Sequence, residues 1–551
     1  MDFILQLVLD LLASWGRMFV ALAFSIAFSV AVGVTAATNK QAEKILIPVI
    51  DVLQTIPILA FFPVVISLFV VLIPGMIGVN SAVIFLIFTS MAWNITFGVY
   101  EAVKSIPDEL VEVARINHLS NFQMLKSIYA PAAMPRIAYQ SAISWSVGLF
   151  YLVTSEIFST GSNNFAVTYG IGVEIAHLVL MQNAVSYAIA ILFFIIAVLL
   201  TRWLFLQPLS IYSERFSFKE EQRASKRSRV IAFYSGIGRS LEKSAHAIIS
   251  KIERFFSLLG RSVEMRMPVA VRIEFKDRGE GKKRELPSTI DESAAKTGIS
   301  AGAVTAVIVA AFIAISAFVV VSTDSYSFVP DLLEALCLSF LRVWGMYIVC
   351  AAISIPLGIK VARSAKSYET VFAVLQVAAS IPATILLPLI VVLLIMMPFG
   401  NELTALAIIF IAMIWYVLFS VIAGMRTIPE QFDELLGIYK VGWVQAWREV
   451  YIPAILPSFV TGSITAIGGA WNALIVAEYF EVGSTVLTQV GSRTDLIGLS
   501  GIGKMLDLAT FQGNLAHMFL AVAAMVVMVM VINRLFWQRI YRHVTLKYRI
   551  E

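Results

Sequence analysis

Two glutamates and one glycine-rich stretch are the residues of this sequence whose types and spacing come closest to chemistry. Glu156 and Glu478 each end a long apolar run, and Gly501-Ile502-Gly503-Lys504 has the composition of a phosphate-binding turn. This turn lacks the preceding glycine of a P-loop, and Met505 stands where a serine or threonine would bind Mg²⁺. The sequence therefore predicts no ATP hydrolysis, no catalytic residue and no metal site in this chain.

The composition indicates an all-α integral membrane protein. Hydrophobic residues make up 59% of the 551 residues and charged residues only 14%. Runs of about 20 apolar residues, the length that crosses a bilayer core of about 30 Å, recur along the chain. Cys337 and Cys350 lie in one such run and are interpreted as small buried hydrophobic residues. We expect about eleven transmembrane helices, at 16–38, 45–73, 82–100, 137–159, 184–206, 300–322, 336–359, 372–397, 403–422, 459–480 and 515–537.

The charges predict the orientation of these helices. About 19 of the 41 lysines and arginines lie between Gln207 and Ile299, and membrane flanks rich in Lys and Arg favour the cytoplasm. Counting spans places the other basic segments on the same side, and the opposite loops 74–81 and 160–183 hold no Lys or Arg. We expect a multi-pass plasma-membrane protein in contact with lipid, with its N-terminus outside and its C-terminus in the cytoplasm. No cleavable signal peptide and no nucleic-acid partner are expected.

The sequence repeats itself in order. Glu434 follows Glu112 by 322 positions, and seven further residues have counterparts at this spacing. Ile56-Pro57 recurs 325 positions later, and Gly170-Ile171-Gly172 recurs after 331. Six predicted spans separate the matched segments, so the two copies are parallel and related by a pseudo-twofold axis along the membrane normal. The later partners at the 322 spacing are Trp415, Gln445, Arg448, Tyr451, Pro453, Pro457 and Glu478.

Each copy contains a basic polar segment whose pattern predicts a helical hairpin. The two segments are 101–136 and 424–457. Pro107 and Pro429 stand at the start of a helix with acidic residues in its first turn. A polar break follows, and then a short second helix that we expect Pro131 or Pro453 to end.

These segments resemble the EAA loop of ABC importer permeases, whose pattern is Glu, two small residues, a Gly, and then Ile-x-Leu-Pro. His118 and Lys440 stand at the glycine position, where both copies depart from the family. The resemblance implies that the short helices at 118–126 and 440–448 fit a groove in an ATPase and transmit its closure. The implied ATPase-coupling residues are Glu112, Ala114, His118, Ser120, Gln123, Pro131, Glu434, Lys440, Gly442, Gln445 and Pro453.

The stretch from Gly469 to Glu478, the repeated Ile-Pro-x5-Pro pattern and the Gly-Ile-Gly triplets resemble the nitrate, sulfonate, taurine and bicarbonate permeases. The resemblance implies the type I ABC importer permease fold in a duplicated single chain. It also implies two copies of an ABC ATPase holding ATP and Mg²⁺, an extracytoplasmic solute-binding protein, and a small anionic substrate. The chain itself would be a transport subunit without a cofactor.

We expect three regions, with permease units at 1–206 and 300–551. Between them, the basic linker 207–299 carries apolar residues at helical spacing from Leu241 to Leu259. This spacing fits an amphipathic helix on the inner membrane surface or, equally, one packed on a partner protein.

Few polar groups in the spans are candidates for a translocation path. Glu156 and Glu478 either contact a gate or binding protein, or accept hydrogen bonds from nearby loop amides, and the second interpretation is favoured because a carboxylate suits an anion path poorly. Tryptophans are usually packing residues or interfacial anchors. The candidates are Trp93, Asn94, Glu156, Trp415, Trp471, Asn472 and Glu478.

Three alternatives stay open at this point. A secondary transporter with parallel repeats would need intramembrane acids for ion coupling, and the spans hold almost none away from their ends. A membrane scaffold or signalling subunit would move no solute. An ABC importer for another solute, such as a thiamine precursor, also fits the sequence.

Overall fold

The computed structural model describes residues 3–160, 167–181, 183–206, 301–363, 368–379, 381–394, 397–428, 431–479 and 499–547, together with Leu209 and Ser213. Throughout these ranges the ordered elements are helices, and no strand occurs among them. The proposed amphipathic helix of the 207–299 linker lies outside the described residues.

The first unit is a bundle of long helices with short ones at its ends. Apolar side chains dominate α1, α4 and α9, as helices in a lipid environment require. Its elements are α1 (Phe3–Thr38), α2 (Lys40–Thr55), η1 (Ile58–Phe61), α3 (Phe62–Leu72), α4 (Met76–Lys104), α5 (Asp108–Ile116), α6 (Asn121–Met124), η2 (Leu125–Tyr129), α7 (Ala130–Thr160), α8 (Ile171–Leu180), α9 (Ala184–Thr201) and η3 (Arg202–Leu206).

The second unit repeats this order and adds α13 before it. α13 packs against α23 and α2. The elements are α13 (Ala301–Ser322), α14 (Phe328–Arg363), α15 (Tyr368–Ala379), α16 (Ala383–Leu394), α17 (Gly400–Arg426), α18 (Gln431–Ile438), α19 (Trp443–Ala446), η5 (Trp447–Tyr451), α20 (Ile452–Tyr479), α22 (Ile502–Phe511), α23 (Leu515–Ile532), η7 (Asn533–Trp537) and α24 (Gln538–Lys547).

The same close helix contacts build both units. α4 packs between α1 and α7, and α17 packs between α14 and α20. A Cβ atom added to Gly33 would lie 2.9 Å from the Val99 side chain, and one added to Gly358 would lie 2.6 Å from Val421. Glycine is therefore required at both positions for these helices to approach so closely. The sequence repeat is thus also a repeat of packing.

Seven helices in the described part of the chain are long and apolar enough to cross a membrane: α1, α4, α9 with η3, α14, α17, α20 with η5 and part of α19, and α23 with η7 and the start of α24. The predicted spans 137–159 and 300–322 correspond to α7 and α13. The count of eleven spans stays a prediction.

The predicted spans 45–73 and 372–397 are not continuous helices. Each is divided near its middle, into α2 and α3 around Ile56-Pro57, and into α15 and α16 around Ile381-Pro382. Proline lacks the amide hydrogen that would continue a helix, and it forces the preceding residue out of the helical region. Ile56 accordingly has extended backbone angles (φ −75°, ψ 125°). Each of these two apolar runs is therefore divided at its Ile-Pro pair.

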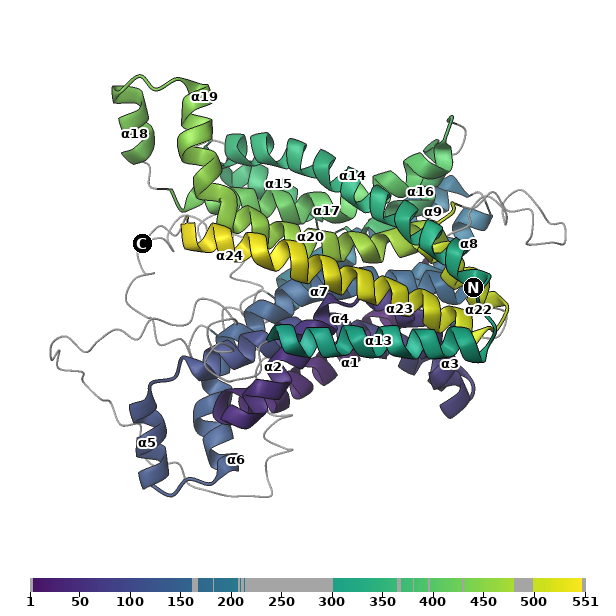
Figure 1. Cartoon of the computed structure of the whole chain (residues 1–551), viewed down its shortest axis with the longest axis horizontal. Coiled ribbons are helices and arrows are strands. Elements are labelled where there is room, and N and C mark those ends of the chain that lie inside the picture. Colours follow the sequence, from purple (N-terminus) through teal and green to yellow (C-terminus); the bar gives the residue numbers. More distant parts are fainter. Residues whose placement is uncertain are drawn as a thin grey trace.

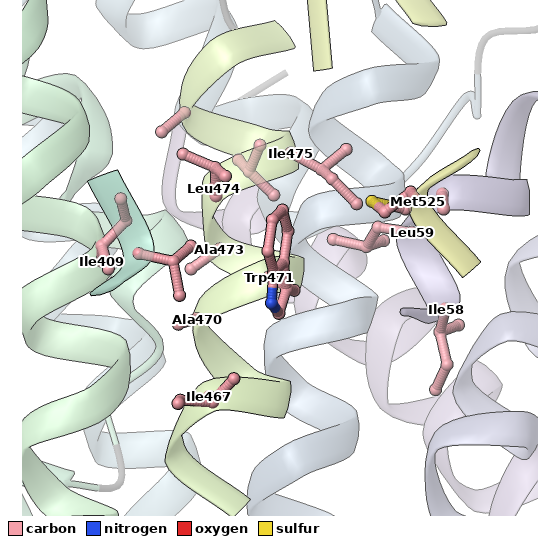
Figure 2. Packing of buried hydrophobic residues seen from close by; sticks show 14 of the residues in the cluster. Ile58, Leu59, Ile409, Ile467, Ala470, Trp471, Ala473, Leu474, Ile475 and Met525 are labelled. Carbon is pink, nitrogen blue, oxygen red and sulfur yellow. The ribbon is translucent and has the colours of Figure 1, made fainter. Parts of the chain in front are cut away.

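A single apolar cluster joins the two units. It includes Ile58 and Leu59 of the first unit and Trp471, Leu474 and Ile475 of the second (Figure 2). The Leu59 amide donates to Asn472 Oδ1 at 3.2 Å, and the Tyr187 hydroxyl of α9 donates to the carbonyl of Ile385 in α16 at 2.8 Å. Both hydrogen bonds cross the boundary between the units, so the units form one packed body.

The two hairpins extend from the same end of this body. In Figure 1, α5 and α6 lie at the lower left and α18 and α19 at the upper left, whereas α8 and α22 lie at the opposite end of the bundle. The start of α1 lies at the α8 and α22 end, and the C-terminal helix α24 runs toward the hairpins.

Candidate functional site: paired hairpins and paired ionic clusters

The first hairpin, residues 105–131, turns sharply between α5 and α6. His118 has a positive φ of 54°, and the amide of Leu119 donates back to the carbonyl of Ala114. Ser120 then begins α6 with a capping box, because its hydroxyl accepts from the Gln123 amide while the Gln123 side chain accepts from the Ser120 amide.

The second hairpin, residues 427–453, repeats this turn. Lys440 has a φ of 48°, and the amide of Val441 donates to the carbonyl of Leu436 at 3.0 Å. Gly442 replaces the capping serine. Gln445 instead donates to Glu449 one turn later. The turn is therefore conserved between copies, but the side-chain cap is not.

The two positive φ angles explain the family's glycine at this position. The left-handed backbone conformation costs a residue with a Cβ atom about 1–2 kcal/mol of conformational free energy, and it costs glycine almost nothing. His118 and Lys440 adopt the conformation for which glycine is best suited. The departure from the family pattern thus changes a side chain while keeping the turn.

Replacing His118 or Lys440 by glycine should stabilise its hairpin by about 0.5–1 kcal/mol, because the left-handed strain is removed. Replacing either residue by valine should destabilise the hairpin, since β-branched side chains tolerate this region worst. Hydrogen exchange of the amides of 114–124 and 436–446 measures both effects. Faster exchange in the glycine variants than in wild type would contradict the turn geometry.

The helix after each turn does not end at the predicted proline. A π-helical turn, η2 or η5, precedes Pro131 or Pro453, and the chain continues into α7 or α20 without a break. The amide of Ala130 donates to the carbonyl of Leu125, one residue further back than in an α-helix. The wider turn accommodates the proline, which cannot donate and would otherwise clash. The hairpins are therefore connected rigidly to the long helices.

The hairpins expose apolar side chains. Ile116 is 75% exposed and Ile438 is 73% exposed at equivalent positions, and Phe122 and Val444 are exposed at the next equivalent pair. Glu112, His118, Ser120, Lys440, Gly442 and Gln445 are also exposed, whereas Gln123, Pro131 and Pro453 are half-buried. Ala114 is buried inside its hairpin and so supports the surface without forming part of it. Of Glu434, the structure describes only the place in α18.

An arginine-centred cluster lies at the other end of the first unit. The Arg17 guanidinium donates to Glu156 Oε1 at 2.6 Å, to Asn80 Oδ1 at 2.7 Å and to the carbonyl of Tyr169. Glu156 is fully buried and also accepts from the amide of Gly172 at 2.8 Å. One arginine thus joins α1, α4, α7 and the segment before α8. Cluster 1 comprises Ser14, Arg17, Asn80, Glu156 and the backbone of 169–172.

The second unit has the equivalent cluster, with a carboxylate at the position of Asn80. Arg342 donates to Glu478 Oε1 at 2.6 Å, to both carboxylate oxygens of Glu402 at 2.6 and 2.8 Å, and to the carbonyl of Ser500. Glu478 accepts from the amide of Gly503 at 2.9 Å. Glu402 occupies the position of Asn80, 322 residues later. Cluster 2 comprises Ser339, Arg342, Glu402, Glu478 and the backbone of 500–503.

These clusters give the Gly-Ile-Gly triplets a physical reason. A Cβ atom on Gly170 would lie 2.6 Å from the Glu156 carboxyl carbon, and one on Gly501 would lie 2.2 Å from that of Glu478. On Gly503 a Cβ would lie 2.7 Å from the backbone oxygen of Ile475. The two glycines of each triplet must lack side chains for the buried glutamate to reach the amide of the second glycine.

Replacing Gly503 by alanine should therefore destabilise the second unit, by about 2–4 kcal/mol, because a backbone atom of α20 cannot move aside cheaply. A Cβ atom added to Gly468 of α20 would meet no atom within 4 Å. Gly468→Ala is therefore the matched control. Thermal unfolding of the detergent-purified chain measures both variants. An unfolding midpoint for Gly503→Ala equal to that of the control would refute the packing argument.

Sequence reasoning found Glu156 and Glu478 but missed their arginine partners. Arg342 follows Arg17, and Ser339 follows Ser14, by 325 positions, the spacing already set by the Ile-Pro pairs. This spacing was a usable signal. The glutamates accept hydrogen bonds from the amides of Gly172 and Gly503, as expected if they cap nearby loop amides. A contact of the glutamates with a gate or a binding protein stays a prediction.

The other predicted path residues are spread along the central helices. Trp93 packs edge-to-face on Phe28, and Trp415 stacks on Phe419. Trp471 is buried at the boundary between the units (Figure 2). Asn472, next to it, is buried, accepts from Leu59 and donates to the carbonyl of Gly468. Asn94 is half-buried in α4. The structure therefore brings Trp471 and Asn472 to the boundary.

Comparison with known proteins agrees with this duplicated geometry. Residues 29–207 and 354–549 both match the family described as the binding-protein-dependent transport system inner membrane component. The chain belongs to this family. The two matches include both hairpins and both Gly-Ile-Gly triplets, and the protein is a multi-pass integral membrane protein of the duplicated, all-α permease type.

Individual relatives are similar over shorter stretches. A nitrate import permease protein of Leptolyngbya laminosa is 27% identical over 145 residues, which is 26% of this chain and 50% of the relative. A bicarbonate transport system permease protein of Synechococcus elongatus is 31% identical over 144 residues, 26% and 49% of the two chains. A taurine transport system permease protein of Escherichia coli is 29% identical over 149 residues, 27% and 52%. The chain thus spans about half the length of the relatives it matches.

Proposed function

We propose that this chain is the transmembrane permease component of an ATP-driven importer, with two permease units fused in one polypeptide. The observation that carries the proposal is the pair of hairpins, which share a left-handed turn residue, a π-helical turn and an exposed isoleucine, and which extend from the same end of the bundle. Both lie inside segments that match the family.

The proposal assigns the power source to a partner. Each hairpin would dock one ABC ATPase subunit that binds ATP and Mg²⁺, so one chain would bind two subunits. The rigid connection of the hairpins to α7 and α20 supports mechanical coupling, because a displacement of the hairpin moves the long helix with it. We divide the chain into units at 1–206 and 300–551, joined by the 207–299 linker.

The orientation follows from the charges. The hairpin end would be cytoplasmic, together with the basic linker and the C-terminus, and the cluster end would face outward, where an extracytoplasmic binding protein would deliver the solute. The basic residues near the hairpins, including Lys104, Lys126 and Arg426, support this orientation.

We further propose that the solute is a small anion. The matched relatives are named for nitrate, bicarbonate, taurine and aliphatic sulfonates. Within the described residues, the buried carboxylates are Asp10, Glu156 and Glu478. Glu156 and Glu478 are engaged by arginine, and Asp10 accepts from the Gly170 amide at the same end of the first unit. The boundary between the units is thus free of buried negative charge in the part of the chain that the structure describes.

Uptake into proteoliposomes tests the proposal. The chain is reconstituted with the ATPase and binding protein encoded beside its gene, with ATP inside and nitrate, bicarbonate or taurine as the probe outside. We expect uptake of at least one anion that needs ATP and survives collapse of the proton and sodium gradients. Uptake that stops with the ion gradients while ATP is retained would indicate a secondary transporter, and absence of any uptake would overturn the anion assignment.

A further inference from the structure

The breaks in the two divided helices lie at the boundary between the units. Ile58 and Leu59 after the first break, and Ala383 and Thr384 after the second, are all buried. α16 contacts α7 of the first unit, and η1 contacts α20 of the second. In Figure 1, α15 and α16 follow each other along the bundle, so the second break lies between its two ends.

A helix that begins inside the membrane presents amides without acceptors. The first amides of any helix lack partners within the helix, and the helix dipole adds partial positive charge at the same point. Such half-helix N-termini bind anionic groups of substrates in transporters of other folds. Each break therefore needs an acceptor group that faces these amides.

The first break is satisfied by the protein itself. Asn472 of α20 places its Oδ1 atom 3.2 Å from the Leu59 amide, and its Nδ2 atom donates to the carbonyl of Gly468. Asn472 is only 7% exposed. Figure 2 shows Leu59 beside the Trp471 region of α20. An acceptor from the opposite unit thus covers this amide.

In the part of the chain that the structure describes, the second break has no such side-chain acceptor, although the amide of Ile385 donates to the carbonyl of Pro382 at 3.1 Å. Thr384 occupies the position of Leu59, 325 residues later, and Phe150 occupies the position of Asn472, 322 residues earlier. Phenylalanine offers no acceptor. Thr384 is 0% exposed, and within the described chain its Oγ1 atom makes no hydrogen bond. Because helical side chains lean toward the N-terminus, this hydroxyl lies beside the first turn of α16.

An unpartnered buried hydroxyl at an uncovered helix start is costly unless a ligand completes it, since a buried polar group without a partner costs about 1–3 kcal/mol. Both donors, the hydroxyl and the amides, suit an acceptor with several oxygens. The adjoining Tyr187 hydroxyl from α9 is already engaged by the carbonyl of Ile385. Both units therefore contribute to the surroundings of this helix start.

We propose that the start of α16, with the Thr384 hydroxyl and the amides of Ala383 and Thr384, is a binding station for one oxyanion on its way between the units. The station rests on the proposed function and deepens it by naming the recognition chemistry: neutral hydrogen-bond donors and a helix dipole. The asymmetry between Asn472 and Phe150 restricts the station to one of the two breaks, so one anion is held per chain.

The first test removes the hydroxyl. Thr384→Val keeps the shape of the side chain and should raise the half-saturating anion concentration for uptake about tenfold, the effect of losing one hydrogen bond to a charged group. Thr384→Ser should stay within about twofold of wild type. Thr404→Val is the matched control, because the Thr404 hydroxyl is satisfied by the carbonyl of Gly400 in its own helix. The half-saturating concentration for Thr404→Val should equal that of wild type.

The second test covers the helix start. Phe150→Asn places at this position the acceptor that Asn472 supplies at the other break, and it should reduce uptake about tenfold or more because the new amide competes with the anion. Phe150→Leu shortens the side chain without adding an acceptor and controls for lost packing. Uptake of nitrate, bicarbonate and taurine is measured for each variant in proteoliposomes.

The outcomes separate the two proposals. If wild type takes up an anion, Thr384→Val and Phe150→Asn lose uptake, and their controls do not, the station is supported. If wild type takes up the anion and Thr384→Val matches it, or Phe150→Leu loses as much as Phe150→Asn, the station is overturned while the importer stands. If wild type takes up none of the three anions, the anion assignment and the station fall together.

Discussion

Replacing Arg342 by methionine should lower the stability of the second unit by about 3–5 kcal/mol, the cost of leaving the buried Glu478 carboxylate without its cation. Arg342 is the shared partner of Glu402 and Glu478, and the Glu478 side chain is fully buried. Without the guanidinium, two carboxylates would face each other at the ends of α17 and α20. We expect the thermal unfolding midpoint of the purified chain to fall sharply.

Two comparison variants make this result specific. Arg17→Met in cluster 1 should cost less, because Asn80, a neutral amide, stands at the position of Glu402. The triple variant Arg342→Met, Glu402→Gln, Glu478→Gln should recover much of the loss, since neutral groups can be buried together at lower cost than unpaired charges. A triple variant that unfolds at a lower temperature than Arg342→Met would show that the arginine acts through packing alone.

Replacing Ile116 and Ile438 together by aspartate should abolish coupling while leaving the chain folded. Both side chains are about three-quarters exposed, so their loss removes little internal packing. A charge at the centre of an apolar docking surface must be desolvated without a partner, which costs several kcal/mol per site. We expect anion uptake and stimulated ATP hydrolysis to fall by two orders of magnitude or more.

Single variants and a conservative pair accompany this experiment. Ile116→Asp and Ile438→Asp alone should each retain part of the ATPase binding, because the other hairpin is intact. Ile116→Val with Ile438→Val should remain close to wild type. Full uptake by the double aspartate variant, at normal membrane levels, would rule out these hairpin surfaces as the docking sites.

The sequence predicted the hairpins well because their signals are local and occur twice. Prolines, first-turn acids and the spacing from Glu112 to Glu434 were enough to place both hairpins in the repeat. The π-helical turns could not be predicted from residue propensity. A proline ordinarily predicts the end of a helix, and the helix continues here because the preceding turn is wider. The wider turn depends on α7 and α20 being held by their neighbours.

The breaks and the clusters show a different limit. Ile56-Pro57 and Ile381-Pro382 were visible, but whether a proline kinks or divides a membrane helix depends on what faces it, such as Asn472 at Leu59. Arg17 stands at the start of the predicted span 16–38, where a charge is expected to flank the membrane, and Arg342 lies inside the predicted span 336–359. Their burial against Glu156 and Glu478 is a tertiary contact between residues more than a hundred positions apart, which no local pattern encodes.

The central claim, that each hairpin docks one ATPase, is tested most directly by the mass of the complex that copurifies with the chain. Native mass spectrometry should find one chain with two ATPase subunits, one subunit after either single aspartate substitution, and none after both. A single subunit on the wild-type chain, or two subunits still bound to the double variant, would contradict the claim.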